Sequence, residues 1–214
     1  MAATETPTVK RRPGRPSIYH NVSEVIKAAA LDLFAERGFE ATSIGDIAEK
    51  AQVPKANVMY YFKTKDDIWR IVVDAQWNQI NQFYAQKLRA PLPLNRTSLE
   101  LAIRTFFEAC QRFPAYTKIP ALEGNSDTWR SRWIAERHLA PHITATRNFH
   151  SQLFAAGIVR NIDPLVFQTL LGGSGHLFFG QAALWRIAEG SGRSEEVFTD
   201  LFVEGLLRLL STVE

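Results

Sequence analysis

The segment from Thr42 to Asp67 constrains the fold of this chain more than any other. Apolar residues recur at helical spacing on both sides of a short break, Gln52-Val53-Pro54. Pro54 suits the first position of a new helix, because its missing N–H would have no partner there. The pattern predicts two short helices joined by a tight turn, which is a helix-turn-helix unit.

Further helices are predicted on both sides of this unit. Before it, Ile26, Leu33 and Phe34 share one face of a predicted helix, and Gly38 is suited to end that helix. After it, Thr64 is placed to cap another helix that continues as a long amphipathic segment. The chain therefore begins its folded part with a small group of helices around a tiny core of its own.

The second helix of a helix-turn-helix unit presents its N-terminal residues to base edges in the major groove. Lys55 can donate to guanine, Asn57 can bond to adenine at two atoms, and Ala56 allows a close approach or contact with a thymine methyl. Neighbouring hydroxyl and ammonium groups can reach phosphate oxygens. The predicted DNA-binding residues are Thr42, Ser43, Lys55, Ala56, Asn57, Tyr60, Tyr61 and Lys65.

Each of these residues also has a simpler interpretation. One of the two tyrosines can pack in the core, Thr42 and Ser43 can serve only as helix caps, and Lys55 can be merely solvated. The combination is more specific than any single member, and it favours DNA binding.

Residues 1–17 form a basic arm in this interpretation. Lys10, Arg11, Arg12 and Arg15 fall close together, and the intervening prolines and glycine disfavour a helix. Such an arm can lie in the narrow, electronegative minor groove, where Arg11, Arg12 and Arg15 would make the contacts. The alternative is a tail that only improves solubility.

Composition limits the remaining classes of protein. The formal net charge is only +3, so an anionic partner must be met by locally placed cations. The single cysteine, Cys110, cannot form an internal disulfide, which fits a reducing compartment. No apolar run approaches the roughly 20 residues of a membrane span, and the N-terminus does not resemble a secretory signal. We expect a cytoplasmic protein without membrane contact.

The rest of the chain is predicted to be entirely helical, so the fold class is all-α. Residues 125–156 are expected to form one long helix that is perturbed at Pro141. Asp163 and Pro164 then begin a helix that is expected to run to about residue 188, and the last helix spans about 194–211. The last two helices are apolar on both faces, which predicts packing on the body and on a second subunit; the alternative is burial within one chain.

The head resembles the DNA-binding domain of the TetR family of bacterial transcriptional regulators over about residues 18–70. The matching residues are Ala29, Leu31, Phe34, Gly38-Phe39, Thr42-Ser43-Ile44, Asp46-Ile47-Ala48, Val53 to Phe62, Lys65 and Ile68. The chain departs from the usual pattern at Pro54, at Ala56-Asn57 and at Met59. The difference at Ala56-Asn57 bears on which operator sequence is bound. Around Arg112-Phe113-Pro114 and Asp163-Pro164 the body is weakly similar to the pyrimidine-utilisation repressors.

The resemblance implies a division into the basic arm (1–17), a helix-turn-helix head (18–80, with the motif at about 42–62) and a helical ligand-binding and dimerisation body (81–214). It implies a homodimer through residues 164–188 and 194–211, a palindromic double-stranded DNA operator, and a small-molecule effector held between helices of the body. His176 is the strongest polar candidate; the alternative, which the sequence favours over a ligand contact, is a packed core histidine bonded to a backbone carbonyl. The tentative effector-binding residues are Trp77, Phe107, Cys110, Tyr116, Trp133, Phe149, His150 and His176.

The favoured function is a repressor that leaves its operator when the effector binds. A ligand-independent global or architectural DNA-binding regulator is the alternative. An enzyme is disfavoured, because the chain has no phosphate-binding loop and no nucleophile elbow. His138 and His142 are one helical turn apart, but no carboxylate pattern supports a metal there. No catalytic residue, metal or cofactor is predicted.

Overall fold

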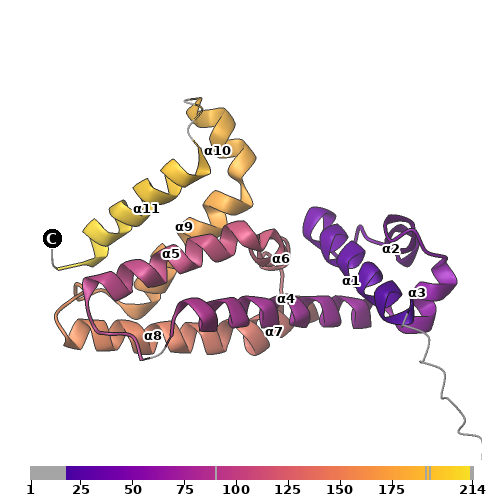
Figure 1. Ribbon diagram of the computed structural model, residues 1–214, viewed down its shortest axis with the longest axis horizontal. Helices are drawn as coiled ribbons and strands as arrows, with labels where there is room; N and C mark the ends of the chain where they lie inside the picture. Colours follow the sequence, from indigo (N-terminus) through magenta and orange to yellow (C-terminus); the bar gives the residue numbers. More distant parts are fainter. Residues whose placement is uncertain (1–17, 90, 191, 193, 213–214) are drawn as a thin grey trace, which may run out of the picture.

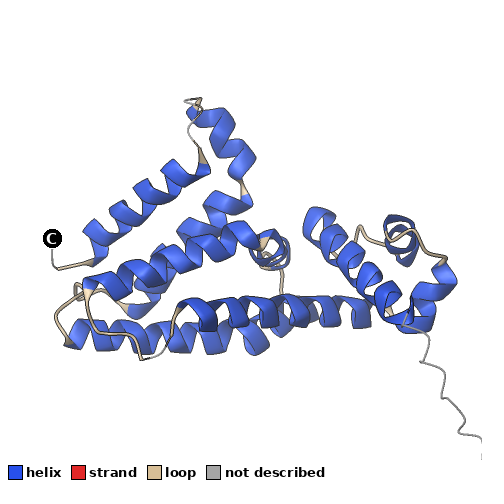
Figure 2. Ribbon diagram, viewed as in Figure 1, coloured by secondary structure: helices blue, strands red, loops and turns tan. Residues whose placement is uncertain are grey.

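A computed structural model describes residues 18–89, 91–190, 192 and 194–212 of the 214-residue chain. Apart from one isolated bridge between Val159 and Ser211, the regular structure of these residues is helical, which confirms the predicted all-α class (Figures 1 and 2). The basic arm, with Arg11, Arg12 and Arg15, lies outside the described residues.

The helices follow one another with short connections. In chain order they are α1 (Ile18–Arg37), α2 (Ile44–Lys50), α3 (Lys55–Tyr61), α4 (Lys65–Lys87), α5 (Arg96–Arg112), α6 (Pro114–Glu123), α7 (Trp129–Ile134), the π-helical turn η1 (Ala135–Leu139), α8 (Ala140–Ala155), α9 (Pro164–Gly180), α10 (Ala182–Glu189) and α11 (Glu195–Leu210).

Local capping explains where the helices of the head begin and end. The Ser43 hydroxyl accepts from the Asp46 N–H and the Asp46 carboxylate accepts from the Ser43 N–H, which is a capping box at α2. Thr64 caps α4 in the predicted way. Gly38 ends α1 with φ of +80°, and Gln52 takes a left-handed φ of +55° in the turn between α2 and α3.

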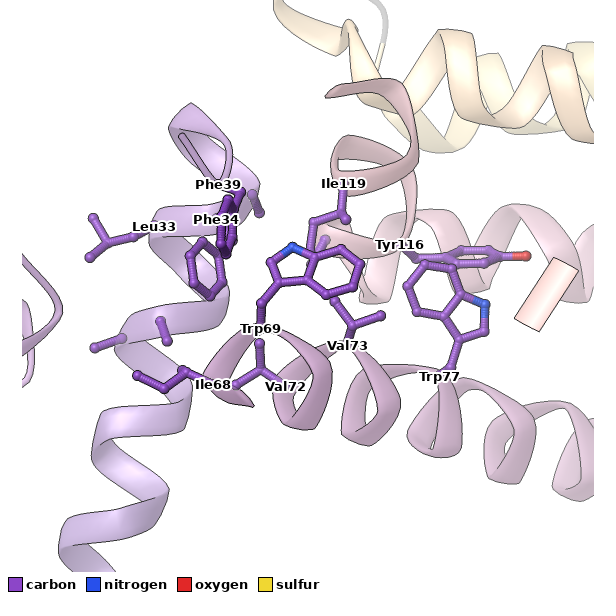
Figure 3. Packing of buried hydrophobic residues seen from close by; sticks show 14 of the residues in the cluster. Leu33, Phe34, Phe39, Ile68, Trp69, Val72, Val73, Trp77, Tyr116 and Ile119 are labelled. Atoms are coloured by element: carbon purple, nitrogen blue, oxygen red, sulfur yellow. The ribbon is translucent and has the colours of Figure 1, made fainter. Parts of the chain in front are cut away.

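The head does not have the separate small core that its sequence suggests. Figure 3 shows Phe34 and Phe39 packed beside Trp69 of α4 and Ile119 of α6, within one continuous apolar cluster. The cause is that α6 of the body packs against α1 as well as α4. The predicted boundary at residue 80 falls inside α4, which runs without interruption from the head into the body.

Two predicted helices of the body are divided. The segment expected as one helix over 125–156 becomes a loop, then α7, η1 and α8, and the π-helical turn precedes Pro141. Because Pro141 has no N–H and its ring crowds the preceding turn, the regular α-helical bonding pattern cannot pass through it. The helix expected to reach residue 188 stops at Gly180, and α10 begins in a new direction after Gln181 (Figure 1).

Among the described residues, no helix combines the length and the apolar character needed to cross a membrane.

Candidate nucleic-acid interface and effector cavity

The N-terminal turn of α3 presents the residues that were predicted to read bases. Lys55 and Ala56 are exposed and Asn57 is half-buried. Tyr60, near the end of the same helix, is 79 % exposed and its ring makes an edge contact with Tyr61. These side chains are available to a partner, and their contact with DNA remains a prediction.

Tyr61 is the tyrosine that packs. It is half-buried against the core cluster of the head and contacts the ring of Phe62. Its neighbour Tyr60 is free of the core, so the alternative that one of the two tyrosines is structural fits Tyr61.

Thr42 and Ser43 are occupied by the head itself. Thr42 is buried, and its hydroxyl donates to the Gly38 carbonyl at 2.8 Å. Ser43 holds the capping box, and its hydrogen bonds lower the pKa of Asp46, helped by the charge of Arg37. This geometry favours the capping interpretation for both hydroxyls. An exposed α2 N-terminus still offers backbone N–H groups to an anion.

Lys65 joins the start of α4 to the turn before α2. Its Nζ donates to the carbonyls of Phe39 at 2.9 Å and Thr42 at 3.0 Å, and it lies 3.9 Å from the centre of the Phe39 ring. An ammonium has three donors, so one is left for a phosphate. The sequence pattern identified Lys65 but not this structural role.

We predict that Lys65→Ala lowers the free energy of unfolding by about 1–3 kcal/mol, because two part-buried carbonyls lose a charged donor. The exposed neighbour Lys63 is the matched control, and Lys63→Ala should change stability by less than about 0.5 kcal/mol. Urea denaturation measures both. If Lys65 also contacts a phosphate, Lys65→Ala should reduce the slope of log affinity against log salt concentration by about one unit. Equal stability of the Lys65→Ala and Lys63→Ala variants would contradict the structural role of Lys65.

Arg130 of α7 connects the body to the head. Its side chain is almost buried; it donates to the buried Glu123 of α6 at 2.8 Å and pairs with Glu40 of the head at 3.0 Å. Its guanidinium also lies 4.3 Å from the centre of the Phe39 ring. One cation therefore touches α6, the α1–α2 connection and the aromatic core at once.

Asp74 of α4 forms a second polar cluster with the segment that follows α7. It accepts from Trp133 Nε1 at 3.2 Å and Arg137 Nε at 3.0 Å, and it lies 2.8 Å from His138 Nε2. The His138 ring stacks on Trp77. Trp77 and Trp133, both tentative effector residues, are therefore used in packing α4 against α7 and η1.

Two cavities lie between the helices of the body, with volumes of about 340 and 470 Å³. Helices α4, α5, α8 and α9 line the first cavity, and α5, α6, α8 and α9 line most of the second. Four residues line both: Phe106, His142, Gln168 and Gly172. The two cavities are therefore neighbouring lobes, and we call the shared region the waist.

Three of the predicted effector residues line these lobes: Phe149 the first, and Tyr116 and His176 the second. Trp77, Phe107, Cys110, Trp133 and His150 line neither. Phe107 packs against the rings of Phe179 and Phe202, and His150 against Phe167. Cys110 is buried, and burial raises the pKa of its thiol, which leaves it inert.

The lining residues that the sequence interpretation missed include Tyr84, Phe106, His142 and Gln168. A signal for Gln168 was present, because it lies four residues before Gly172 and eight before His176, on one face of an otherwise apolar helix. The others are contributed by separate helices, so no local pattern identifies them.

The histidines of the waist and the second lobe are neutral near pH 7. Burial lowers the pKa of His142. Burial, followed by the nearby His142, lowers the pKa of His176 to about 4. Both imidazoles can then donate one hydrogen bond and accept another.

This architecture defines a helix-turn-helix protein with a cavity-bearing helical body. Residues 26–70 match the bacterial regulatory proteins of the tetR family. The transcriptional repressor ComR of Escherichia coli is 32 % identical over 109 residues, which cover 51 % of this chain and 49 % of ComR. The regulator RutR of Escherichia coli is 30 % identical over 106 residues, covering 47 % of this chain and 46 % of RutR.

The chain thus spans about half the length of these curated relatives in the matches. The structure of the ketosteroid regulator KstR2 of Mycobacterium tuberculosis superposes with a TM-score of 0.72 at 17 % identity, covering 92 % of this chain and 97 % of KstR2. The head of this chain therefore matches the tetR family over residues 26–70, and the whole chain shares the fold of these solved regulators.

Proposed function

We propose that this protein is a dimeric transcriptional repressor that binds a palindromic DNA operator and is released by a small molecule held in the body. The observation that carries the proposal is the N-terminal turn of α3, where Lys55 and Ala56 are exposed and Asn57 is half-buried, beside Val58 of the core cluster. A rigid helix end bearing a cation and an amide is the arrangement that reads base edges.

The dimer is supported by the surface of the last three helices. Large apolar side chains there are exposed in the single chain, including Leu165, Leu177, Leu184, Ile187 and Leu209. Exposed apolar surface on this scale marks an interaction site. A two-fold dimer also places two recognition helices on successive half-sites.

Release by an effector is supported by the position of α6. Tyr116, Thr117 and Pro120 of this helix line the second lobe, and Glu123 at its end is paired with Arg130. Arg130 also holds Glu40 of the head. A molecule that displaces α6 would therefore act on a helix already packed against α1, which is a shared element that both sites can bias.

We predict that Asn57→Ala relaxes the preference at one base pair and costs roughly 1–3 kcal/mol on the operator. The test is fluorescence anisotropy with operator fragments found by footprinting the DNA beside the gene. Substituting each base pair in turn distinguishes base reading from general attraction. The control variant is Gln52→Ala, a change at an exposed residue in the turn before α3. It should leave the preference at every base pair unchanged.

An equal loss of affinity on all sequences would contradict base reading by Asn57. Broad binding of the unaltered protein with little sequence preference, unaffected by any small molecule, would favour the alternative of a ligand-independent global or architectural regulator. Absence of binding to any duplex DNA would overturn the proposed function.

A further inference from the structure

We infer that the effector is an uncharged, elongated and largely apolar molecule that carries a hydrogen-bonding group near its middle, held at the waist by Gln168. The inference rests on the proposed function, because it concerns the effector of that regulator. Its basis is the chemistry of the two lobes.

The shape follows from the residues that the lobes share. Because Phe106, His142, Gln168 and Gly172 face both lobes, a single molecule passing the waist can occupy both. Their volumes of about 340 and 470 Å³ fall within the range of small-molecule sites. A ligand that fills both must be long and narrow where it passes these four side chains.

The apolar character follows from the ends of the lobes. Leu88, Leu92 and Leu99 line the first lobe, and Pro120, Leu139 and Ile143 line the second. Such surfaces gain from burying hydrocarbon and offer nothing to a polar group. The polar group of the ligand that pairs with Gln168 therefore lies at the waist, between two apolar ends.

The absence of charge follows from the lining as a whole. In the part of the chain that the structure describes, no lysine, arginine, aspartate or glutamate lines either lobe. Burial keeps the imidazoles of His142 and His176 neutral. A buried carboxylate or phosphate would lack a counter-charge here, which is strongly unfavourable.

The hydrogen-bonding group follows from an unpaired atom at the waist. Gln168 Oε1 is buried and has no hydrogen-bond partner within the described residues. Buried polar atoms without partners are rare in native proteins and call for one. A hydroxyl or an amide N–H of the ligand would satisfy Gln168.

The test uses the full chain and the neutral dye Nile red, whose fluorescence rises in apolar surroundings. We expect 6-dodecanol, a neutral chain with its hydroxyl near the middle, to displace the dye at a concentration at least ~10-fold lower than dodecanoate does near neutral pH, since only the latter brings a charge. Both probes are used below the concentrations at which they aggregate. Equal displacement by the two probes, or stronger displacement by dodecanoate, would overturn the inference.

Two variants locate the site. Gln168→Leu should weaken displacement by 6-dodecanol by about 5–10-fold through loss of one buried hydrogen bond, whereas Gln152→Leu on the exposed part of α8 should not. Gly172→Leu should abolish dye binding, because the leucine side chain would enter the waist. The variant should still fold, because leucine has a higher helix propensity than glycine. Dye binding that survives this change, or no dye binding by the unaltered protein, would also overturn it.

Failure of this inference is distinguishable from failure of the proposed function. Operator binding is measured by anisotropy without any probe, so a protein that binds its operator but prefers dodecanoate retains the function and refutes only the ligand class. A protein that binds 6-dodecanol through Gln168 but binds no DNA keeps the ligand class and refutes the proposed function.

Discussion

Replacement of Arg130 by methionine should lower the free energy of unfolding by about 3–5 kcal/mol, because it leaves a buried carboxylate without its counter-charge. That carboxylate belongs to Glu123, whose side chain is 7 % exposed, and the Arg130 side chain is 9 % exposed. Methionine keeps the length of the apolar stem, so the loss would report the ion pair rather than packing. Urea denaturation followed by tryptophan fluorescence gives the measurement.

The chain contains a matched control for this prediction. Arg132 lies two residues further on and forms a two-fold hydrogen-bonded pair with Asp127, but both side chains are more than two-thirds exposed. Arg132→Met should cost no more than about 1 kcal/mol. The double change Arg130→Met with Glu123→Leu should recover much of the loss, since no buried charge then remains. Similar costs for the two arginines would contradict the importance of burial.

A substitution of Glu40 can test communication between head and body without a large change in stability. Its carboxylate is 80 % exposed, so Glu40→Gln should have little effect on unfolding. It nevertheless removes the charge by which Arg130 contacts the head. If this contact transmits effector binding, the variant should bind the operator normally and respond less to the effector.

The second large effect is expected at Gly175, where alanine should destabilise the protein by about 1–3 kcal/mol. A Cβ atom at this position would lie 2.9 Å from Cζ of Phe106 and closer still to Cε1. Phe106 cannot easily withdraw, because it is 8 % exposed and contacts the rings of Phe107, Tyr116 and His176. Phe106 lines both lobes, so a ring displaced into them should also reduce Nile red binding.

Gly173, on the same helix, is the control. A Cβ there would meet only the Thr169 side chain at 4.0 Å, an ordinary contact. Gly173→Ala should therefore raise stability by up to about 1 kcal/mol through helix propensity. Thermal unfolding of both variants tests the pair, and a gain in stability at Gly175 would show that α9 does not approach α5 as closely as the structure has it.

Helix position and type were predicted well where local chemistry controls them. The caps at Thr64 and Asp163 and the helix-ending Gly38 were identified from residue type and spacing alone, whereas the cap of α2 was left between Thr42 and Ser43 and is Ser43 in the structure. Errors occurred where the helical spacing of apolar residues continues past the end of a helix, as after Gly180. Such spacing is the same on both sides of a break, so it does not reveal where the helix axis changes direction.

The predicted sites were recovered unevenly for the same reason. The recognition turn of α3 consists of consecutive residues, so its exposure could be inferred from the motif. The effector cavity draws side chains from five helices, and only Tyr116, Phe149 and His176 of the eight tentative residues line it. An aromatic residue on an amphipathic helix faces either the packed core or a cavity, and its own sequence neighbourhood is the same in both cases.

The sequence by itself determined the helices of the head and the helix-turn-helix unit, because these depend on interactions within a few residues along the chain. Only the tertiary structure decided that Thr42 and Lys65 hold the head together, that Arg130 bridges α6 to Glu40, and that Gln168 and His142 share a waist. Those contacts join residues on separate helices, and the crossing of helices depends on the packing of the whole core.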